Sequence, residues 1–280
     1  MSTPYNPETE GAEMSFSDKM SYGDYLKLDQ ILTAQELKTS THDELLFIIQ
    51  HQVSELWLRL AIHELNAART LIAQNEGDVR PAFKMLTRVA RIFEQLNSAW
   101  DVLRTMTPSE YTAFRDDLGE SSGFQSHQYR LIEFILGNRN EAMLKPHEHV
   151  PESHALLLAE LSEPSLYDEV LRALARQGHN EPAATLERDV SQPHAFSQEV
   201  QNMWEDIYRN PRANWMAYEL AEKLVDMEDY FRRWRFNHVT TVERIIGSKR
   251  GTGGTGGVSY LQRMLKVELF PELWAVRTVL

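Results

Sequence analysis

The sequence contains no cysteine among its 280 residues. Disulfides, cysteine-ligated zinc, iron–sulfur clusters, covalently attached c-type haem and thiolate-ligated haem are therefore excluded. A metal ion or a metal-bearing cofactor would have to be bound through histidine, carboxylate or methionine. The absence of cysteine makes the ten histidines the first residues to consider.

Positive charge and long apolar runs are also scarce. The chain carries 29 Lys and Arg against 41 Asp and Glu, a formal net charge of -12, so we expect no nucleic-acid partner. No uncharged apolar run could cross a membrane, and the first fifteen residues are acidic, with Pro4 and Pro7 and no apolar core. The sequence therefore predicts no membrane association, no secretory signal and a cytoplasmic location.

Strand-like alternation of apolar and polar residues is missing, and no repeat of fixed period occurs. Apolar residues recur instead at helical spacing, which predicts an all-α fold, a helical bundle with long core helices. We expect a disordered tail at 1–18 and a single domain over 19–280. The expected helices cover 44–74, 78–106, a short segment from 108, a segment ending at 136, 165–177, 211–246 and 259–269.

Helix starts are marked by capping residues. Thr41 with Glu44, and Thr107 with Glu110, match the capping box that opens a helix. Ser122 is a further candidate cap. The sequence therefore predicts where two helices begin without reference to any tertiary contact.

Two stretches differ from this regular pattern. Between about 145 and 200, prolines at 146, 151, 164, 182 and 193 interrupt the apolar spacing, and we interpret the stretch as a variable surface subregion. Residues 21–32, SYGDYLKLDQIL, form a short aromatic amphipathic segment with Tyr22 and Tyr25 at helical spacing. It is typical of a docking element, and the sequence leaves open whether it docks on its own chain or on a neighbouring one.

One histidine lies on the apolar stripe of the last long helix. Counting back from His238 by helical steps gives Trp234, Phe231, Met227 and Leu224. A buried imidazole requires a hydrogen bond, a charged partner or a metal. The helix ends at Gly247, and a loop follows whose glycines could bring backbone amides and Thr252 or Thr255 against a ligand. This loop could equally be a flexible linker.

A second histidine, His51, lies one turn after Phe47 on a stripe of the helix at 44–74. A lone histidine of this kind is usually a satisfied core residue, but two of them on two long helices could form a haem pocket. An iron porphyrin needs an axial imidazole, apolar walls and an open opposite face. The helix at 78–106, with Trp100 at clean apolar spacing, is interpreted as plain core.

Other candidate sites are weaker. No Glu is followed three residues later by His, so the di-iron carboxylate pattern is missing, and HExxH is absent. His147, His149 and His154 lie in a proline-containing acidic stretch, where a solvated loop competes with metal binding. The GTGGTG run at 251–256 matches a dinucleotide fingerprint formally, but it follows a helix and not a strand.

Tyr111 and Arg115 are one helical turn apart. An arginine beside a tyrosine hydroxyl can receive a substrate carboxylate. The alternative is that they are surface neighbours, with Arg115 paired to Asp116 or Glu110.

Several long motifs together resemble the bacterial tryptophan 2,3-dioxygenase family. They are FIIQHQVSELWLRL (47–60), TPSEYTAFRDDLGESSGFQS (107–126), WRFNHVTTVERIIGSKRGTGGTGGVSYLQ (234–262) and FPELWAVR (270–277). The similarity covers nearly the whole chain from about Ser21. The weakly patterned region 145–200 departs from it.

The resemblance implies a homotetrameric, all-helical enzyme with haem b, ferrous (Fe2+) in the active state. Such an enzyme inserts both atoms of O2 across the indole C2–C3 bond of L-tryptophan to give N-formylkynurenine, the first step of the kynurenine pathway. Two rival functions are a non-catalytic haem-binding sensor or gas carrier and a broader-specificity indole dioxygenase. A helical scaffold with no cofactor is a third alternative.

The resemblance also implies a role for individual residues. His238 would be the axial ligand of the haem iron and His51 the distal histidine that accepts the indole N–H. The remaining site residues would line the indole pocket (Phe47), hold the carboxylate (Arg115 with Tyr111), contact the amino-acid end (Thr252), occupy a polar position on the distal side (Ser122), or come from the neighbouring subunit (Tyr22, Tyr25 and Leu26).

Overall fold

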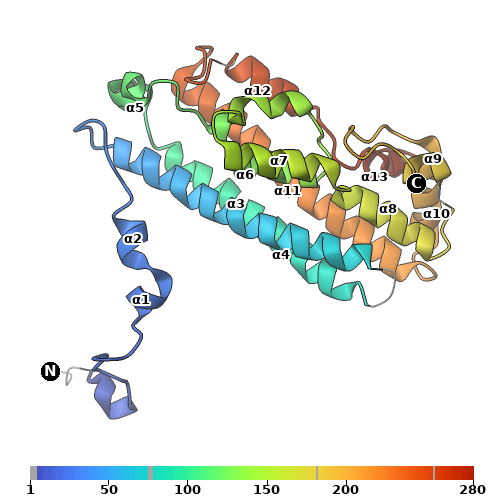
Figure 1. The fold of residues 1–280 in the computed structure, drawn as a ribbon, viewed down its shortest axis with the longest axis horizontal. Helices are drawn as coiled ribbons and strands as arrows, with labels where there is room; N and C mark the ends of the chain where they lie inside the picture. Colours follow the sequence, from blue (N-terminus) through green and yellow to red (C-terminus); the bar gives the residue numbers. More distant parts are fainter. Residues whose placement is uncertain (1–4, 75–77, 181, 255) are drawn as a thin grey trace.

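The computed structural model describes residues 5–74, 78–180, 182–254 and 256–280, and every regular element in these ranges is a helix. The all-α prediction is therefore confirmed. Three long helices dominate (Figure 1): α3 (Glu44–Ala73), α4 (Arg80–Leu103) and α11 (Trp215–Ile246). Over the same ranges, no helix has the length and apolar character needed to cross a membrane.

The shorter helices surround this frame. They are α1 (Tyr22–Leu26), α2 (Leu28–Leu32), α5 (Pro108–Arg115), α6 (His127–Ile135), α7 (Pro151–Ser162), α8 (Leu166–Arg176), α9 (Ala183–Leu186), α10 (Gln198–Arg209), α12 (Val258–Met264) and α13 (Pro271–Ala275). Short 3-10 turns cover Pro7–Glu10, Asp116–Leu118, Gly123–Gln125, Glu141–Met143, Lys145–His147 and Val276–Thr278.

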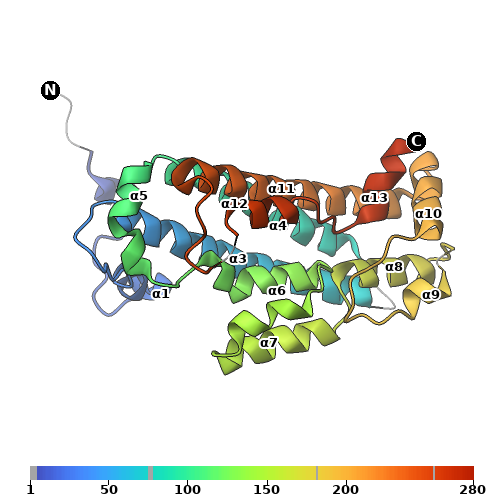
Figure 2. The ribbon, with the colours of Figure 1, turned by 90° about the horizontal axis from the view of Figure 1, so that it is seen from above.

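Helix α4 lies between α3 and α11 and packs along both (Figure 2). Their shared face is fully buried and apolar: Leu65 of α3, Phe93 of α4 and Phe231 of α11 each expose 0% of their surface. The rings of Phe93 and Phe231 meet edge to face with centroids 5.0 Å apart. Apolar stripes at helical spacing thus form the contact that the sequence pattern predicts.

The predicted helix starts have mixed outcomes. The capping box at Thr107 is confirmed, since the main-chain N–H of Thr107 donates to the Glu110 carboxylate at 2.6 Å and the Thr107 side chain accepts from the N–H of Glu110. Ser122 also caps, although the element it opens is the 3-10 turn before α6. The predicted box at Thr41 is wrong. The buried carboxylate of Glu44 accepts instead from the main-chain N–H groups of Lys38 and Thr39.

Two boundaries of α11 and α4 also differ from the sequence pattern. Helix α11 begins at Trp215, because residues 211–214 form turns after Pro211. Helix α4 covers Arg80–Leu103 and not 78–106. The C-terminal stop at Gly247 is confirmed, with a φ of 62°.

The interpretation of 145–200 as a surface subregion is wrong for its central helix. Most of α8 is buried, including Leu166, Val170 and Leu174. The sequence pattern does not predict helices α7 and α9, because prolines near their starts are typical of helix interruption. Pro151 instead occupies the first turn of α7, where a missing N–H carries no cost. The expected variability of this region stays a prediction.

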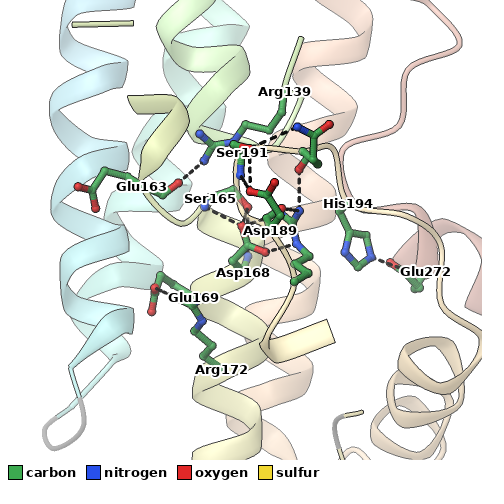
Figure 3. Close-up of polar contacts among 12 residues, drawn as sticks. Arg139, Glu163, Ser165, Asp168, Glu169, Arg172, Asp189, Ser191, His194 and Glu272 are labelled. Carbon is green, nitrogen blue, oxygen red and sulfur yellow. Dashed lines mark hydrogen bonds and ion pairs between the residues drawn. The ribbon is translucent and has the colours of Figure 1, made fainter. Parts of the chain in front are cut away.

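Buried polar contacts fix this region to the rest of the fold (Figure 3). Asp168 accepts hydrogen bonds from Ser165 and from both Nε and Nη2 of Arg188, at 2.7 and 2.8 Å for the arginine. Farther along, His194 donates from Nε2 to the fully buried Glu272 of α13 at 2.7 Å. The segment after α8 is therefore held against the C-terminal helix by charge-assisted hydrogen bonds.

The N-terminal segment leaves the bundle. Residues 8–20 are exposed, and α1 and α2 project away from the three long helices (Figure 1). Tyr22 and Tyr25 expose 76% and 73% of their surface. Residues 1–4 of the expected disordered tail lie outside the described ranges, and the disorder stays a prediction.

Candidate functional site

His238 lies in an aromatic environment on α11. Its imidazole stacks on the indole of Trp100 from α4, with centroids 5.0 Å apart and planes 16° from parallel. Trp234, one turn earlier on α11, contacts both rings, and Tyr129 of α6 contacts Trp234. Burial lowers the pKa of His238 to about 4, and repulsion from His51 adds to the shift. The ring is therefore neutral at physiological pH, the state in which imidazole binds metals.

His51 lies on α3 with one ring nitrogen already engaged. Its Nδ1 is 2.7 Å from the main-chain oxygen of Phe47. A carbonyl oxygen can only accept, so Nδ1 carries the hydrogen and Nε2 is left as an acceptor in the neutral ring. Burial lowers the pKa of His51, against the opposing effect of this hydrogen bond. The structure thus assigns the tautomer and keeps the ring uncharged.

The two histidines belong to one region of the molecule. Repulsion between them contributes to the pKa of His238, which requires the rings to lie within electrostatic range. Phe47, one turn before His51, and Trp100, stacked on His238, pack against the same small buried cluster of Leu103, Met106 and Phe114. Both histidines are of intermediate exposure as whole residues.

Helix α5 adds a tyrosine and an arginine. Tyr111 contacts Phe47 at 5.8 Å between centroids. Burial raises the pKa of Tyr111, while the nearby charge and hydrogen bond of Arg115 oppose the rise. Arg115 donates from Nη2 to the main-chain oxygen of Arg250 at 2.7 Å, and its buried Nε finds no partner within the described part of the chain.

The alternative assignment of Arg115 is not supported. In the ranges that the structure describes, Arg115 forms no ion pair with Asp116 or Glu110. The Glu110 carboxylate instead accepts from the N–H of Thr107 in the capping box. The guanidinium therefore keeps donors available for an incoming anion.

The glycine-rich loop closes onto this end of the bundle. The hydroxyl of Thr252 donates to the main-chain oxygen of Ser121 at 2.6 Å. A Cβ on Gly253 would lie 2.8 Å from the Cβ of Ser122, so only glycine fits this contact. Thr255 lies outside the described residues. Packing against Ser121, Ser122 and Arg115 favours a lid over a flexible linker.

Other predicted positions lie elsewhere. Tyr22, Tyr25 and Leu26 are on α1, away from this site in the single chain (Figure 1). His147 is buried and not in a solvated loop, with 3% of its surface exposed. Among the described residues, no group of three or more His, Asp or Glu side chains could hold a metal ion.

Sequence reasoning missed Trp100 and Tyr129. Both occur at the apolar spacing of ordinary core helices, and nothing in that pattern separates a residue beside a functional imidazole from any other core aromatic. Their role becomes visible only when α4, α6 and α11 are brought together.

The residues present fit a haem. A single neutral imidazole of low pKa, a wall of aromatic rings and a second neutral imidazole with a free acceptor match the needs of an axially ligated porphyrin with an accessible opposite face. The indole Nε1 of Trp100 is a buried donor that has no partner within the described residues, which is consistent with a polar group being bound beside it.

Comparisons with known proteins agree with this geometry. A family model described as tryptophan 2,3-dioxygenase matches residues 7–280. The tryptophan 2,3-dioxygenase of Bradyrhizobium diazoefficiens is 69% identical over 279 residues, 100% of this chain and 99% of the relative. That of Ruegeria pomeroyi is 65% identical over 99% of both chains, and that of Cupriavidus necator 61% identical over 96% of this chain and 90% of the relative. The chain belongs to the tryptophan 2,3-dioxygenase family.

Proposed function

We propose that this protein is a haem-dependent dioxygenase that inserts both atoms of O2 across the indole C2–C3 bond of L-tryptophan. The product is N-formylkynurenine, and the reaction is the first step of tryptophan catabolism by the kynurenine pathway. The observation that carries the proposal is the pair of neutral imidazoles, His51 and His238, which come from two helices and lie within electrostatic range of each other.

His238 is the residue that would hold haem b through its iron. Its low pKa keeps a lone pair available for the metal, and the indole of Trp100 stacks on a face of the imidazole. When bound, ferrous haem would supply the site at which O2 is activated. Both oxygen atoms end in the product, so turnover consumes no external electrons and requires no docking surface for a reductase.

The protein's own task is to hold the substrate. His51 Nε2 accepts the indole N–H, since Nδ1 is committed to the Phe47 carbonyl. Phe47 lines the indole pocket, and its contact with Tyr111 joins that pocket to α5. Arg115, beside Tyr111, binds the carboxylate of the amino acid with its available donors. His51 orients the ring in this scheme, and no proton abstraction by it is required.

The glycine loop completes the amino-acid end of the site. Thr252 is held against Ser121, and Gly253 against Ser122. The loop therefore covers Arg115 through the Arg250 carbonyl and reduces the access of water to the bound carboxylate.

The proposed assembly is a homotetramer in which α1 docks on a neighbouring subunit. Support comes from the exposed aromatic residues of α1 and from an exposed apolar stripe on α3, Leu45, Ile49, Val53 and Leu56. In this assembly Tyr22, Tyr25 and Leu26 would reach the neighbour's site. Sedimentation of the intact protein as a monomer would contradict it. The cytoplasmic location stays a prediction.

Replacing His238 with Ala tests the ligand assignment. We expect the purified variant to lose the Soret absorption of the wild-type protein and all formation of N-formylkynurenine, measured by mass spectrometry under air with a reductant present. Retention of haem with full turnover would contradict the assignment. A wild-type protein that binds haem and forms no product would instead be a sensor or gas carrier, and a colourless one a scaffold.

Replacing Arg115 with Leu tests the carboxylate contact. Loss of a charge-assisted contact in a covered pocket costs about 2–5 kcal/mol, so the KM for tryptophan should rise far more than the KM for O2. Equal effects on both constants would argue against the contact. Tryptamine, which lacks the carboxylate, is the matched substrate: comparable wild-type activity on it would favour a broader-specificity indole dioxygenase.

The pH dependence of kcat/KM tests His51. Burial lowers its pKa below the ordinary value of 6.5, and the protonated ring cannot accept the indole N–H. Activity should therefore be fully present near pH 7 and fall only as the pH drops below 6.5, through the lowered pKa of the free enzyme. The His51→Ala variant should lack this acid limb. If the acid limb of the kcat/KM profile stayed at the same pH in His51→Ala, the titrating group would be a residue other than His51.

Gly253→Ala tests the packing of the loop. The new Cβ would meet Ser122 and displace the loop, so the KM for tryptophan should rise by about tenfold or more, since small misplacements of positioning groups can cost about 100-fold. Ser122→Gly removes both side-chain atoms that the new Cβ meets. Ser122→Gly alone is the control, because the Ser122 hydroxyl also caps the 3-10 turn at Gly123–Gln125. Relative to that control, adding Gly253→Ala should raise the KM little, and a rise of about tenfold on this background would mean that the contact with Ser122 is not the cause.

A further inference from the structure

A polar seam runs between α4 and α11 beside His238. Asn97 and Trp100 of α4 and Arg104, the residue that caps the C-terminus of α4, are spaced by three and four residues. Arg104 keeps helical backbone angles, so the three side chains lie on one face. Trp100 stacks on His238. The two polar residues on either side of Trp100 contact α11 as well, and they enclose the aromatic contact.

Arg104 contacts one turn of α11 with most of its donors. Its Nε donates to the hydroxyl of the buried Thr241 at 2.7 Å. Its Nη2 donates to the main-chain and side-chain oxygens of Asn237, at 3.2 and 3.3 Å, and to the hydroxyl of Thr240. All four acceptors belong to residues 237–241, the turn that carries His238.

Asn97 holds the same turn from the other side of Trp100. Its Nδ2 donates to the main-chain oxygen of Tyr230 at 3.0 Å, and its Oδ1 accepts from Nδ2 of Asn237 at 2.8 Å. Asn237, the residue before His238, is therefore bonded to Asn97 of α4 and to Arg104 at its C-terminal cap. Apolar packing alone tolerates small slides between helices, whereas directional hydrogen bonds fix one position.

An ordinary surface ion pair does not explain Arg104. Its nearest carboxylate oxygen, on Asp101, is 3.9 Å from Nη1, and the Asp101 side chain is 80% exposed. Such a pair contributes little. The guanidinium makes its shorter contacts with the neutral acceptors on α11, and it donates its hydrogen bonds to them.

We propose that Arg104 is a positioning residue for the imidazole of His238. By bonding residues 237, 240 and 241, it fixes the rotation and the axial position of this turn of α11 against Trp100. A shift of one residue along a helix moves a side chain by about 1.5 Å and turns it by about 100°, so small errors in register would change the angle at which His238 presents its lone pair. The inference rests on the proposed role of His238 as the haem ligand.

The surface around Arg104 permits a chemical rescue. A pocket of about 500 Å³, lined by Asp101, Arg104, Thr105, Thr240 and Arg244, opens beside the guanidinium. Truncation of the side chain would enlarge a space that a guanidinium ion can enter from solvent. Arg244 is the matched control, because it lines the same pocket on α11 but makes only a long bond, 3.4 Å, to the main-chain oxygen of Arg104.

The experiment compares Arg104→Ala, Arg104→Lys and Arg244→Ala as holoproteins. The readouts are the iron–imidazole stretching band in the resonance Raman spectrum of the ferrous protein and the rate of haem transfer to an excess of apomyoglobin. Outer-shell partners of metal ligands typically contribute 10–100-fold. We expect both Arg104 variants to lose haem about tenfold faster with a shifted band, and Arg244→Ala to match the wild-type protein. Millimolar guanidinium should restore the Arg104→Ala band.

Hydrogen–deuterium exchange of the haem-free proteins gives a second readout. Amides following residue 237 on α11 should exchange faster in Arg104→Ala than in Arg244→Ala, even where neither protein binds haem. A lower melting temperature with an unchanged band and an unchanged haem transfer rate would overturn the proposal and leave Arg104 a general stabilising residue. Haem bound normally by the His238→Ala variant would refute the ligand assignment, whereas the exchange rates of the haem-free proteins would still test the contact of Arg104 with α11.

Discussion

Burial of two imidazoles is the constraint on which the site depends. In water a histidine titrates near neutrality, and each of these would then carry a fractional charge. Burial, with a smaller contribution from repulsion by His51, brings the pKa of His238 to about 4, and burial also lowers the pKa of His51. One ring can then donate a lone pair to a metal and the other can accept a hydrogen bond. At His51 the bond to the Phe47 carbonyl and the charge of Glu55 oppose the lowering of the pKa, but the effect of burial is larger.

The two neutral rings are held in different ways. His51 is fixed from within its own helix, because its Nδ1 bonds the carbonyl of Phe47 one turn earlier. His238 has no such local partner among the contacts described, and it depends on Trp100 and on the polar seam between α4 and α11. The orientation of His51 is therefore a property of local sequence, and that of His238 is a property of helix packing.

This difference explains how much the sequence could predict. The apolar spacing placed His51 and His238 on two long helices, and the resemblance to a family assigned their roles. Arg104 could not be found in this way, since its acceptors lie more than 130 residues away in the chain. The two capping boxes show the same limit: the one at Thr107 forms, but the carboxylate of Glu44 is taken by the main chain of Lys38 and Thr39.

Prolines led to a second kind of error. A proline inside a helix breaks it, but one in the first turn costs nothing. Local sequence around Pro151 does not separate the two cases, because α7 is established by packing of Leu157 and Leu161 on Phe134. The apolar spacing predicts helix α8 but does not predict that α8 is buried. Its position in the core depends on contacts with α3 and on the hydrogen bonds between Asp168 and Arg188, which local sequence does not reveal.

The arrangement also separates what must stay fixed from what must admit substrate. The His238 side of the site is built from α4 and α11, whose contact combines a continuous apolar core with directional hydrogen bonds. The Arg115 side is built from α5 and the glycine loop, which meet through a few polar contacts such as Arg115 with the Arg250 carbonyl. Those few contacts can open at a small free-energy cost. In the function proposed above, the orientation of His238 would therefore not need to change when tryptophan entered and the loop closed over its carboxylate.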